Sequence, residues 1–129
     1  MTSREKIESY LLKLSLSFEK AGHDSWIVKD SDKGIDNLLI LLAEPLAIMR
    51  INVMAAPKAS REKLFELLLK LNATDMSHGA YALDGNNVII IDTLEVDTMD
   101  LEEFEASIDA IGVALAQHLR LLSAYHAKA

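Results

Sequence analysis

The sequence contains no cysteine, which excludes disulfide bonds, thiol nucleophiles and zinc–thiolate sites. Its five glycines are spread singly, so no glycine-rich loop is available to hold a phosphate, and no G-x-S-x-G turn presents a serine nucleophile. No run approaches the roughly 18 apolar residues that would span a membrane. The first residues lead directly into a charged helix rather than a signal peptide, so we expect a soluble, cytoplasmic protein that does not bind membranes.

Positive charge is missing from a long part of the chain. There is no Lys or Arg between Lys70 and Arg120, whereas ten acids lie there: Asp75, Asp84, Asp92, Glu95, Asp97, Asp100, Glu102, Glu103, Glu105 and Asp109. This segment would repel a phosphate backbone, so nucleic acid is not an expected partner. The acids either form a solvated face that keeps the protein soluble or steer a basic partner towards it.

Candidate catalytic and metal-binding residues are few. The four histidines have no metal-ligand spacing, and we expect each to lie on the surface: His23, His78, His118 and His126. Four acids before the last helix could gather a divalent cation, although their position favours helix capping: Asp92, Glu95, Asp97 and Asp100. The sequence therefore predicts a protein that is not an enzyme and has no metal or other cofactor.

The chain does contain apolar residues, whose spacing changes in a clear order along the sequence. Its length of 129 residues, half of them hydrophobic, predicts one domain over residues 1–129. Thr2 with Glu5 forms a capping box before a helical stripe. Ile7, Leu11, Leu14 and Phe18 make up that stripe, and Gly22 is placed to end the helix.

Strand patterns follow the first helix. Residues 25–29, 38–43 and 46–54 read as three strands, and the short connection between the last two favours an antiparallel hairpin. A helix that Ser60 can cap comes next and is apolar nearly all round. Residues 80–83 and 87–92 flank an Asp-Gly turn and predict a second hairpin. Asp100, with Glu103, then begins the closing helix. The expected class is α+β in the order αβββαββα, with an antiparallel sheet packed against helices.

This order resembles a known fold. An apolar strand begins at Val88 and is followed by an acidic connection that contains the apolar residues Leu94, Val96 and Met99. Asp100 then begins an amphipathic helix. The pattern is similar to that of the type III secretion chaperone-like fold, which includes the class I chaperones of the Tir-chaperone family and the YbjN-like proteins. The resemblance implies a non-enzymatic homodimer that binds an extended segment of a partner protein, such as a secreted effector.

The apolar excess suggests where these contacts lie. The second helix has little polar face, so the resemblance places the dimer interface on that helix and the last two strands, with Phe65, Leu68, Tyr81 and Ile89 as candidates. The first helix carries Tyr10, Leu12 and Leu16 outside its main stripe. We expect these three to contact the partner segment, helped by a sheet edge near residues 25–29 that could accept a peptide strand.

Two other interpretations remain open at this point. Within the same fold, the chain could be a YbjN-like regulatory protein with a different partner. From another class, it could be a small ligand-binding protein or an enzyme that uses the region of His23, Asp24 and Trp26. That third hypothesis requires a pocket in which polar groups converge.

Overall fold

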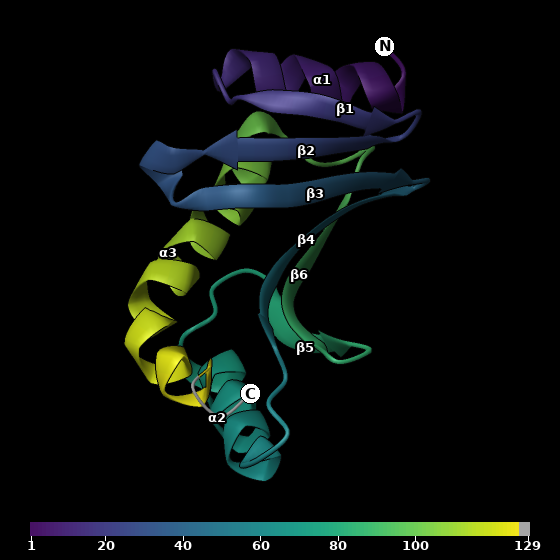
Figure 1. Ribbon diagram of the computed structural model, residues 1–129. Helices are drawn as coiled ribbons and strands as arrows, with labels where there is room; N and C mark the ends of the chain where they lie inside the picture. Colours follow the sequence, from purple (N-terminus) through teal and green to yellow (C-terminus); the bar gives the residue numbers. More distant parts are fainter. Residues whose placement is uncertain (127–129) are drawn as a thin grey trace.

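The computed structural model describes residues 1–126, which form three α-helices, one short 3-10 helix and six strands (Figure 1). In chain order these are α1 (Ser3–Lys13), β1 (Phe18–Gly22), β2 (Ser25–Asp30), η1 (Ser31–Lys33), β3 (Ile35–Ala43), β4 (Leu46–Ala55), α2 (Arg61–Thr74), β5 (Ala80–Asp84), β6 (Asn87–Glu95) and α3 (Leu101–His126). The strands form one antiparallel sheet in the order β1-β2-β3-β4-β6-β5. The predicted α+β class is confirmed.

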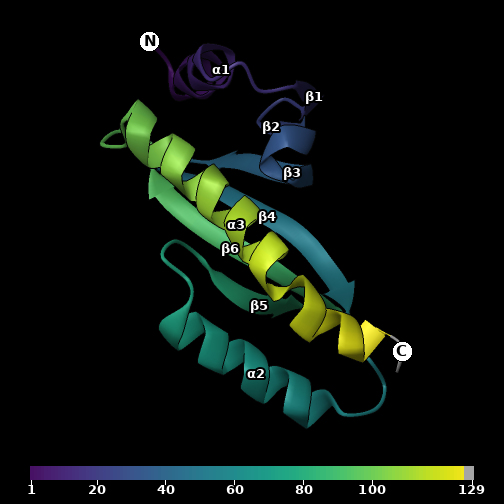
Figure 2. The same ribbon diagram turned by 90° about the vertical axis from the view of Figure 1, so that its left-hand side faces the viewer.

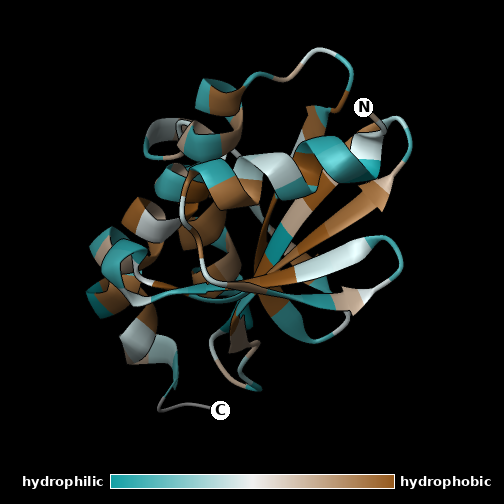
Figure 3. Cartoon of the chain, turned by 90° about the horizontal axis from the view of Figure 1, so that it is seen from above, coloured by the Kyte–Doolittle hydropathy of each residue, from teal (hydrophilic) through white to brown (hydrophobic). Residues whose placement is uncertain are grey.

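The three helices lie at different positions along the sheet. Figure 2 shows α3 crossing the sheet, with α1 near one end and α2 beside β5 near the other. The strand register places Trp26, Ile40 and Met49 side by side on the covered face, and all three are fully buried. Phe104 and Ile108 of α3 complete this core. From above, long hydrophobic stretches follow the strands (Figure 3).

The first helix is shorter than predicted. Its capping box is present, since the Thr2 hydroxyl accepts from the Glu5 amide and the Glu5 carboxylate accepts from the Thr2 amide. The helix ends at Lys13, however, and Ser15 adopts a left-handed conformation. Residues 18–22 then form β1, so the predicted helix through Phe18 to Gly22 was wrong. Phe18 lies four residues after Leu14 and therefore fits the helical stripe, but it belongs to an additional strand.

The remaining predicted elements are present with small changes of boundary. The hairpins at residues 43–46 and 84–87 both connect antiparallel strands. Asp100 caps α3, because its carboxylate accepts from the Glu103 amide at 2.7 Å and the Glu103 carboxylate accepts from the Asp100 amide at 3.1 Å. Ser60 precedes α2, but its side chain makes no capping hydrogen bond, which contradicts its predicted role.

Candidate partner-binding surfaces

The three residues predicted to contact a partner segment lie in different environments. Leu16 is only 6% exposed and belongs to the core. The Tyr10 ring packs edge-on against Phe104 at 5.5 Å, and its hydroxyl donates to the Met99 carbonyl at 3.3 Å. Leu12 is 68% exposed. Of the three, Leu12 is therefore the side chain that α1 presents to solvent.

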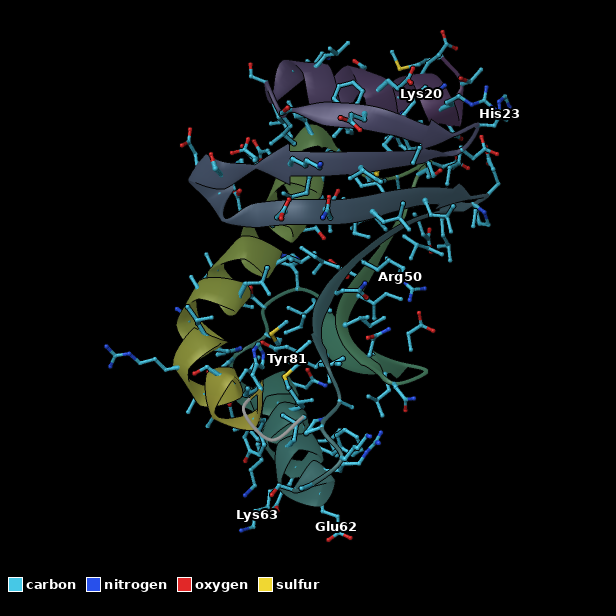
Figure 4. The ribbon with its side chains drawn as sticks, in the orientation of Figure 1. Lys20, His23, Arg50, Glu62, Lys63 and Tyr81 are labelled. Atoms are coloured by element: carbon cyan, nitrogen blue, oxygen red, sulfur yellow. The ribbon has the colours of Figure 1, made fainter. Side chains whose placement is uncertain are left out.

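Polar contacts fasten α1 to the hairpin of β1 and β2. Arg4 pairs with Asp24 at 3.0 Å and also hydrogen-bonds the ring and the carbonyl oxygen of His23. Glu8 accepts from the Trp26 indole at 3.0 Å and lies 3.6 Å from the Lys20 ammonium. The indole hydrogen bond is the main reason that the pKa of Glu8 lies below its usual value. Figure 4 shows Lys20 and His23 at this end of the molecule.

These contacts also bear on the hypothesis of a ligand site at His23, Asp24 and Trp26. The Trp26 side chain is fully buried, so it offers no open ring face to a ligand. The polar groups of His23 and Asp24 are instead directed to Arg4. In the structure, these three residues connect α1 to the hairpin of β1 and β2.

The open edge of the sheet near α1 is β1. Residues 25–29 belong to β2, which lies between β1 and β3, so they do not form the predicted edge of the sheet; β1 does. Within residues 1–126, β1 pairs only with β2. Next to it, on the sheet face opposite Trp26, the register aligns Ile27 of β2 with Leu39 of β3, and both are partly exposed. An edge strand beside partly exposed apolar side chains can accept an extended peptide.

A second apolar surface lies between α2 and β5. We call it the α2–β5 hollow, a depression of about 320 Å³ lined by Phe65, Leu68, Leu69, Asn72, Tyr81, Ala82 and Leu83. It brings together three of the four residues predicted for the dimer interface, and adds Leu69 and Leu83, which are 69% and 49% exposed. Sequence reasoning missed these two leucines, although their spacing from Phe65 and Tyr81 could have indicated them.

The fourth predicted interface residue, Ile89, lies elsewhere. It pairs with Asn52 and Ala82, on the sheet face opposite Tyr81, and is only 3% exposed. Arg50 of β4 forms an ion pair with Asp84 of β5. Arg50 is aligned with Ile91 and Asp84 with Asn87, so the two charged side chains reach across β6 on either side of Ile89. Ile89 therefore does not line the α2–β5 hollow, although its pairing partner Ala82 does.

One histidine is not on the surface. His118 is 1% exposed, so its predicted surface location was wrong. Its Nδ1 lies 2.6 Å from the Tyr81 hydroxyl and its Nε2 lies 3.2 Å from the Asp75 carboxylate. This chain joins β5, α3 and the end of α2, and Figure 4 shows Tyr81 between the two helices. The helical spacing of Ile111, His118 and Leu122 was the sequence signal for burial.

The environment of this chain shifts two of its groups. Burial raises the pKa of Tyr81 to about 12, and the nearby carboxylate of Asp75 acts in the same direction. The Thr74 hydroxyl, followed by His118, holds the pKa of Asp75 below its usual value. At neutral pH, Tyr81 therefore remains a neutral hydroxyl beside the buried ring.

Two of the four acids considered as a cation site make structural hydrogen bonds. Asp92 accepts from the Ser107 hydroxyl at 2.5 Å, and Asp100 caps α3. This supports the interpretation that helix capping explains the position of Asp100.

Within residues 1–126 no helix is long and apolar enough to cross a membrane.

Comparisons with known proteins agree with this geometry. The family model CesT_Tir_1, which describes type III secretion chaperones, matches residues 1–128. No curated protein matches the sequence. Among solved structures, a chain of the heterodimeric ExoU–SpcU complex from the type III secretion system of Pseudomonas aeruginosa is similar at a TM-score of 0.72 and 12% identity, covering 89% of this chain and 96% of that one.

Two further structures share the fold. YbjN from E. coli has a TM-score of 0.66 at 15% identity, with 90% of each chain covered. The Yersinia pestis type III secretion chaperone SycH, in complex with a fragment of YscM2, has a TM-score of 0.65 at 14% identity, covering 90% of this chain and 98% of the other. At these identities the likeness concerns the fold.

Proposed function

Because the chain belongs to the CesT_Tir_1 family of type III secretion chaperones, we propose that it acts as a class I chaperone, a non-enzymatic homodimer that holds an extended segment of a partner protein. Structures of similar fold support a protein partner, since the ExoU–SpcU structure and the SycH structure are complexes between proteins. A secreted effector is the kind of partner that this family suggests.

The α2–β5 hollow is the observation that carries the proposal of a dimer. Exposed apolar patches on small soluble proteins commonly mark interfaces. In a two-fold dimer the same patch meets its own copy, so Leu69 or Leu83 of one subunit would enter the hollow of the other. Asn72 strengthens this surface from within, because its side chain accepts from the Tyr81 amide at 2.7 Å and donates to the Tyr81 carbonyl at 3.1 Å. These two hydrogen bonds connect α2 to β5, the two elements that line the hollow.

The dimer can be tested by light scattering in the micromolar range. We expect the mass of two chains for the wild-type protein and of one chain for Leu69→Asp, which places a charge in the interface. Leu119→Asp is the matched control, because Leu119 is similarly exposed but lies on α3, outside the hollow. A wild-type protein with the mass of a single chain would contradict the dimer.

The partner segment would bind at the other end of the molecule. The candidate contacts there are the exposed Leu12 of α1, the open edge of β1, and the partly exposed Ile27 and Leu39 on the sheet face opposite Trp26. Backbone hydrogen bonds to β1 would give affinity, while apolar contacts would give selectivity. The net charge of −7 would favour a partner that carries Lys or Arg, mainly through the association rate.

A pull-down from the native host followed by binding assays with the recovered protein tests this surface. Leu12→Glu should weaken binding without changing the fold, whereas Leu119→Glu, on α3, should not. Equal binding by both variants would exclude the α1 surface. If the recovered partner were a regulatory protein unrelated to secretion, the YbjN-like alternative would be preferred.

A further inference from the structure

Cationic side chains gather where α2 begins and α3 ends, although the protein as a whole is acidic. The sequence contains no Asp or Glu at positions 45–61 or 110–129. Four basic residues lie in or beside the two helix ends: Lys58, Arg61, Lys63 and Arg120. Within residues 1–126, none of the four forms an ion pair. Figure 4 shows Lys63 at the beginning of α2, with Glu62 as its acidic neighbour.

Two of these cations border a depression between the helices. We call it the α2–α3 cleft, a space of about 540 Å³ lined by Ser60, Lys63, Leu67, Arg120, Leu121, Ala124 and Tyr125. Leu121 is 47% exposed, so an apolar side chain is accessible there from solvent. The cleft thus combines an apolar lining with two positive charges that form no ion pair within the described residues.

The cleft lies on a different side of α2 from the α2–β5 hollow. Successive helical residues turn by about 100°, which follows from 3.6 residues per turn. The buried stripe of α2 is formed by Leu64, Leu68 and Leu71. Lys63 and Leu67 therefore flank one side of this stripe, and Phe65, Leu69 and Asn72 flank the other. A partner in the hollow would leave the cleft accessible.

We propose that the α2–α3 cleft binds an acidic segment of another protein that carries an apolar side chain. Carboxylates of the segment pair with Lys63 and Arg120, while its apolar side chain packs against Leu67, Leu121 and Tyr125. The acids elsewhere on the surface repel such a segment and direct it to this region. The site is separate from both surfaces of the proposed chaperone function and does not depend on them.

Fluorescence anisotropy with a labelled synthetic peptide tests the proposal. The probe alternates Glu with Leu and Phe. One control peptide has Lys in place of Glu, and another has Ser in place of Leu and Phe. The variant Lys63→Glu/Arg120→Glu should weaken binding of the probe about tenfold, as expected for the loss of two partly exposed ion pairs. Lys13→Glu/Lys29→Glu changes the net charge equally at exposed positions away from the cleft and should have a much smaller effect.

Leucine substitutions separate the apolar contribution from the charge. Leu121→Ser should weaken binding of the probe, whereas Leu119→Ser should not, because Leu119 is exposed on the same helix but does not line the cleft. The proposal is overturned if the probe does not bind at millimolar concentration, or if both charge-reversed variants lose affinity equally. It is also overturned if the Ser peptide or a single-stranded oligonucleotide of the same charge binds as tightly, since either result would indicate a general polyanion surface.

Discussion

The two ends of the molecule hold their helices in different ways. At the first end, α1 is attached by polar contacts as well as by apolar ones: Arg4 to Asp24, Glu8 to Trp26, and Lys6 to the Val96 carbonyl at 2.5 Å. At the other end, α2 is attached by the apolar stripe of Leu64, Leu68 and Leu71, by the Asn72 side chain and, just after its last residue, by the contact of Asp75 with His118. The polar contacts of α1 are spread along the helix, whereas those of α2 are confined to its C-terminal end and the rest of its attachment is apolar.

The difference extends to what each helix leaves uncovered. Leu12 is the large apolar side chain of α1 that is highly exposed, whereas α2 and β5 leave Leu69 and Leu83 exposed around a hollow. An isolated exposed leucine is ordinary on a soluble protein, while a contiguous apolar hollow requires an explanation. The comparison supports the proposal that the α2 end makes a large, apolar contact and the α1 end a smaller one beside a strand edge.

The largest expected effect tests the α1 end. Leu16→Glu would place a carboxylate in the core and should abolish cooperative unfolding, because burying an unpaired charge costs several kcal/mol. Leu12→Glu should change the free energy of unfolding by no more than about 0.5 kcal/mol. Urea denaturation followed by circular dichroism measures both. A stably folded Leu16→Glu protein would show that this leucine is not required in the core.

The second effect tests the helix that connects the two ends. A Cβ atom on Gly112 would lie 2.2 Å from the Lys33 carbonyl oxygen, so α3 and η1 would have to separate. That region is also held by the Lys33 ammonium, which lies 2.6 Å from the Asp109 carboxylate. Gly112→Ala should lower the free energy of unfolding by about 1–3 kcal/mol, as overpacking does.

The neighbouring variant Val113→Ala is the control for this measurement, since Val113 is largely exposed. It should lower the free energy of unfolding by much less. If both variants unfold at the same urea concentration, the close approach of α3 to η1 does not limit stability. If Gly112→Ala produces two separate transitions, the two ends of the molecule unfold independently.

The third effect tests the α2 end. Tyr81→Phe removes the hydroxyl that lies 2.6 Å from His118 Nδ1 and leaves a buried nitrogen without its partner. The expected loss at neutral pH is about 1–3 kcal/mol. Tyr125→Phe, a partly buried tyrosine at the end of α3, is the control and should cost less. Equal losses would indicate that the Tyr81–His118 contact adds little.

The same residue predicts a dependence on alkaline pH. The pKa of Tyr81 is about 12 in the folded protein, above the ordinary value of 10.0, so the unfolded chain releases this proton first as the pH rises. The stability is complete below pH 10 and falls between pH 10 and 12, by about 2–3 kcal/mol at most. Wild-type protein should therefore lose more stability than Tyr81→Phe across this window, as measured by urea denaturation at each pH.

Local patterns predicted most of the fold. Capping boxes and turn residues act over three or four positions, and the boxes at Thr2 and Asp100 are both present. The prediction failed at Phe18, where a helical spacing continues from Leu14 although the chain has already turned at Ser15. The pairing of residues 18–22 with β2 is a contact between segments, which the periodicity of one segment does not report.

The candidate sites were harder to predict for the same reason. Phe65, Leu68 and Tyr81 were identified as candidate interface residues because an apolar excess is visible in the sequence, and the structure places all three at one hollow. The environments of Leu16 and Ile89 depend on which elements lie over them, so the sequence could not distinguish them from exposed positions. His118 was missed because it was judged by its residue type, although its spacing from Ile111 and Leu122 places it on the buried face of α3.

The smallest expected effect concerns the start of α3. Asp100→Ala removes a cap and should lower the free energy of unfolding by about 1 kcal/mol, while Asp97→Ala, an exposed neighbour outside the cap, should have little effect. Because the cap lies outside the α2–β5 hollow, the mass measured by light scattering should be the same as for the wild-type protein. We also expect calcium and magnesium to leave the melting temperature of the wild-type protein unchanged. A metal-dependent rise that Asp100→Ala abolishes would show that these acids bind a cation, and would replace capping as their main role.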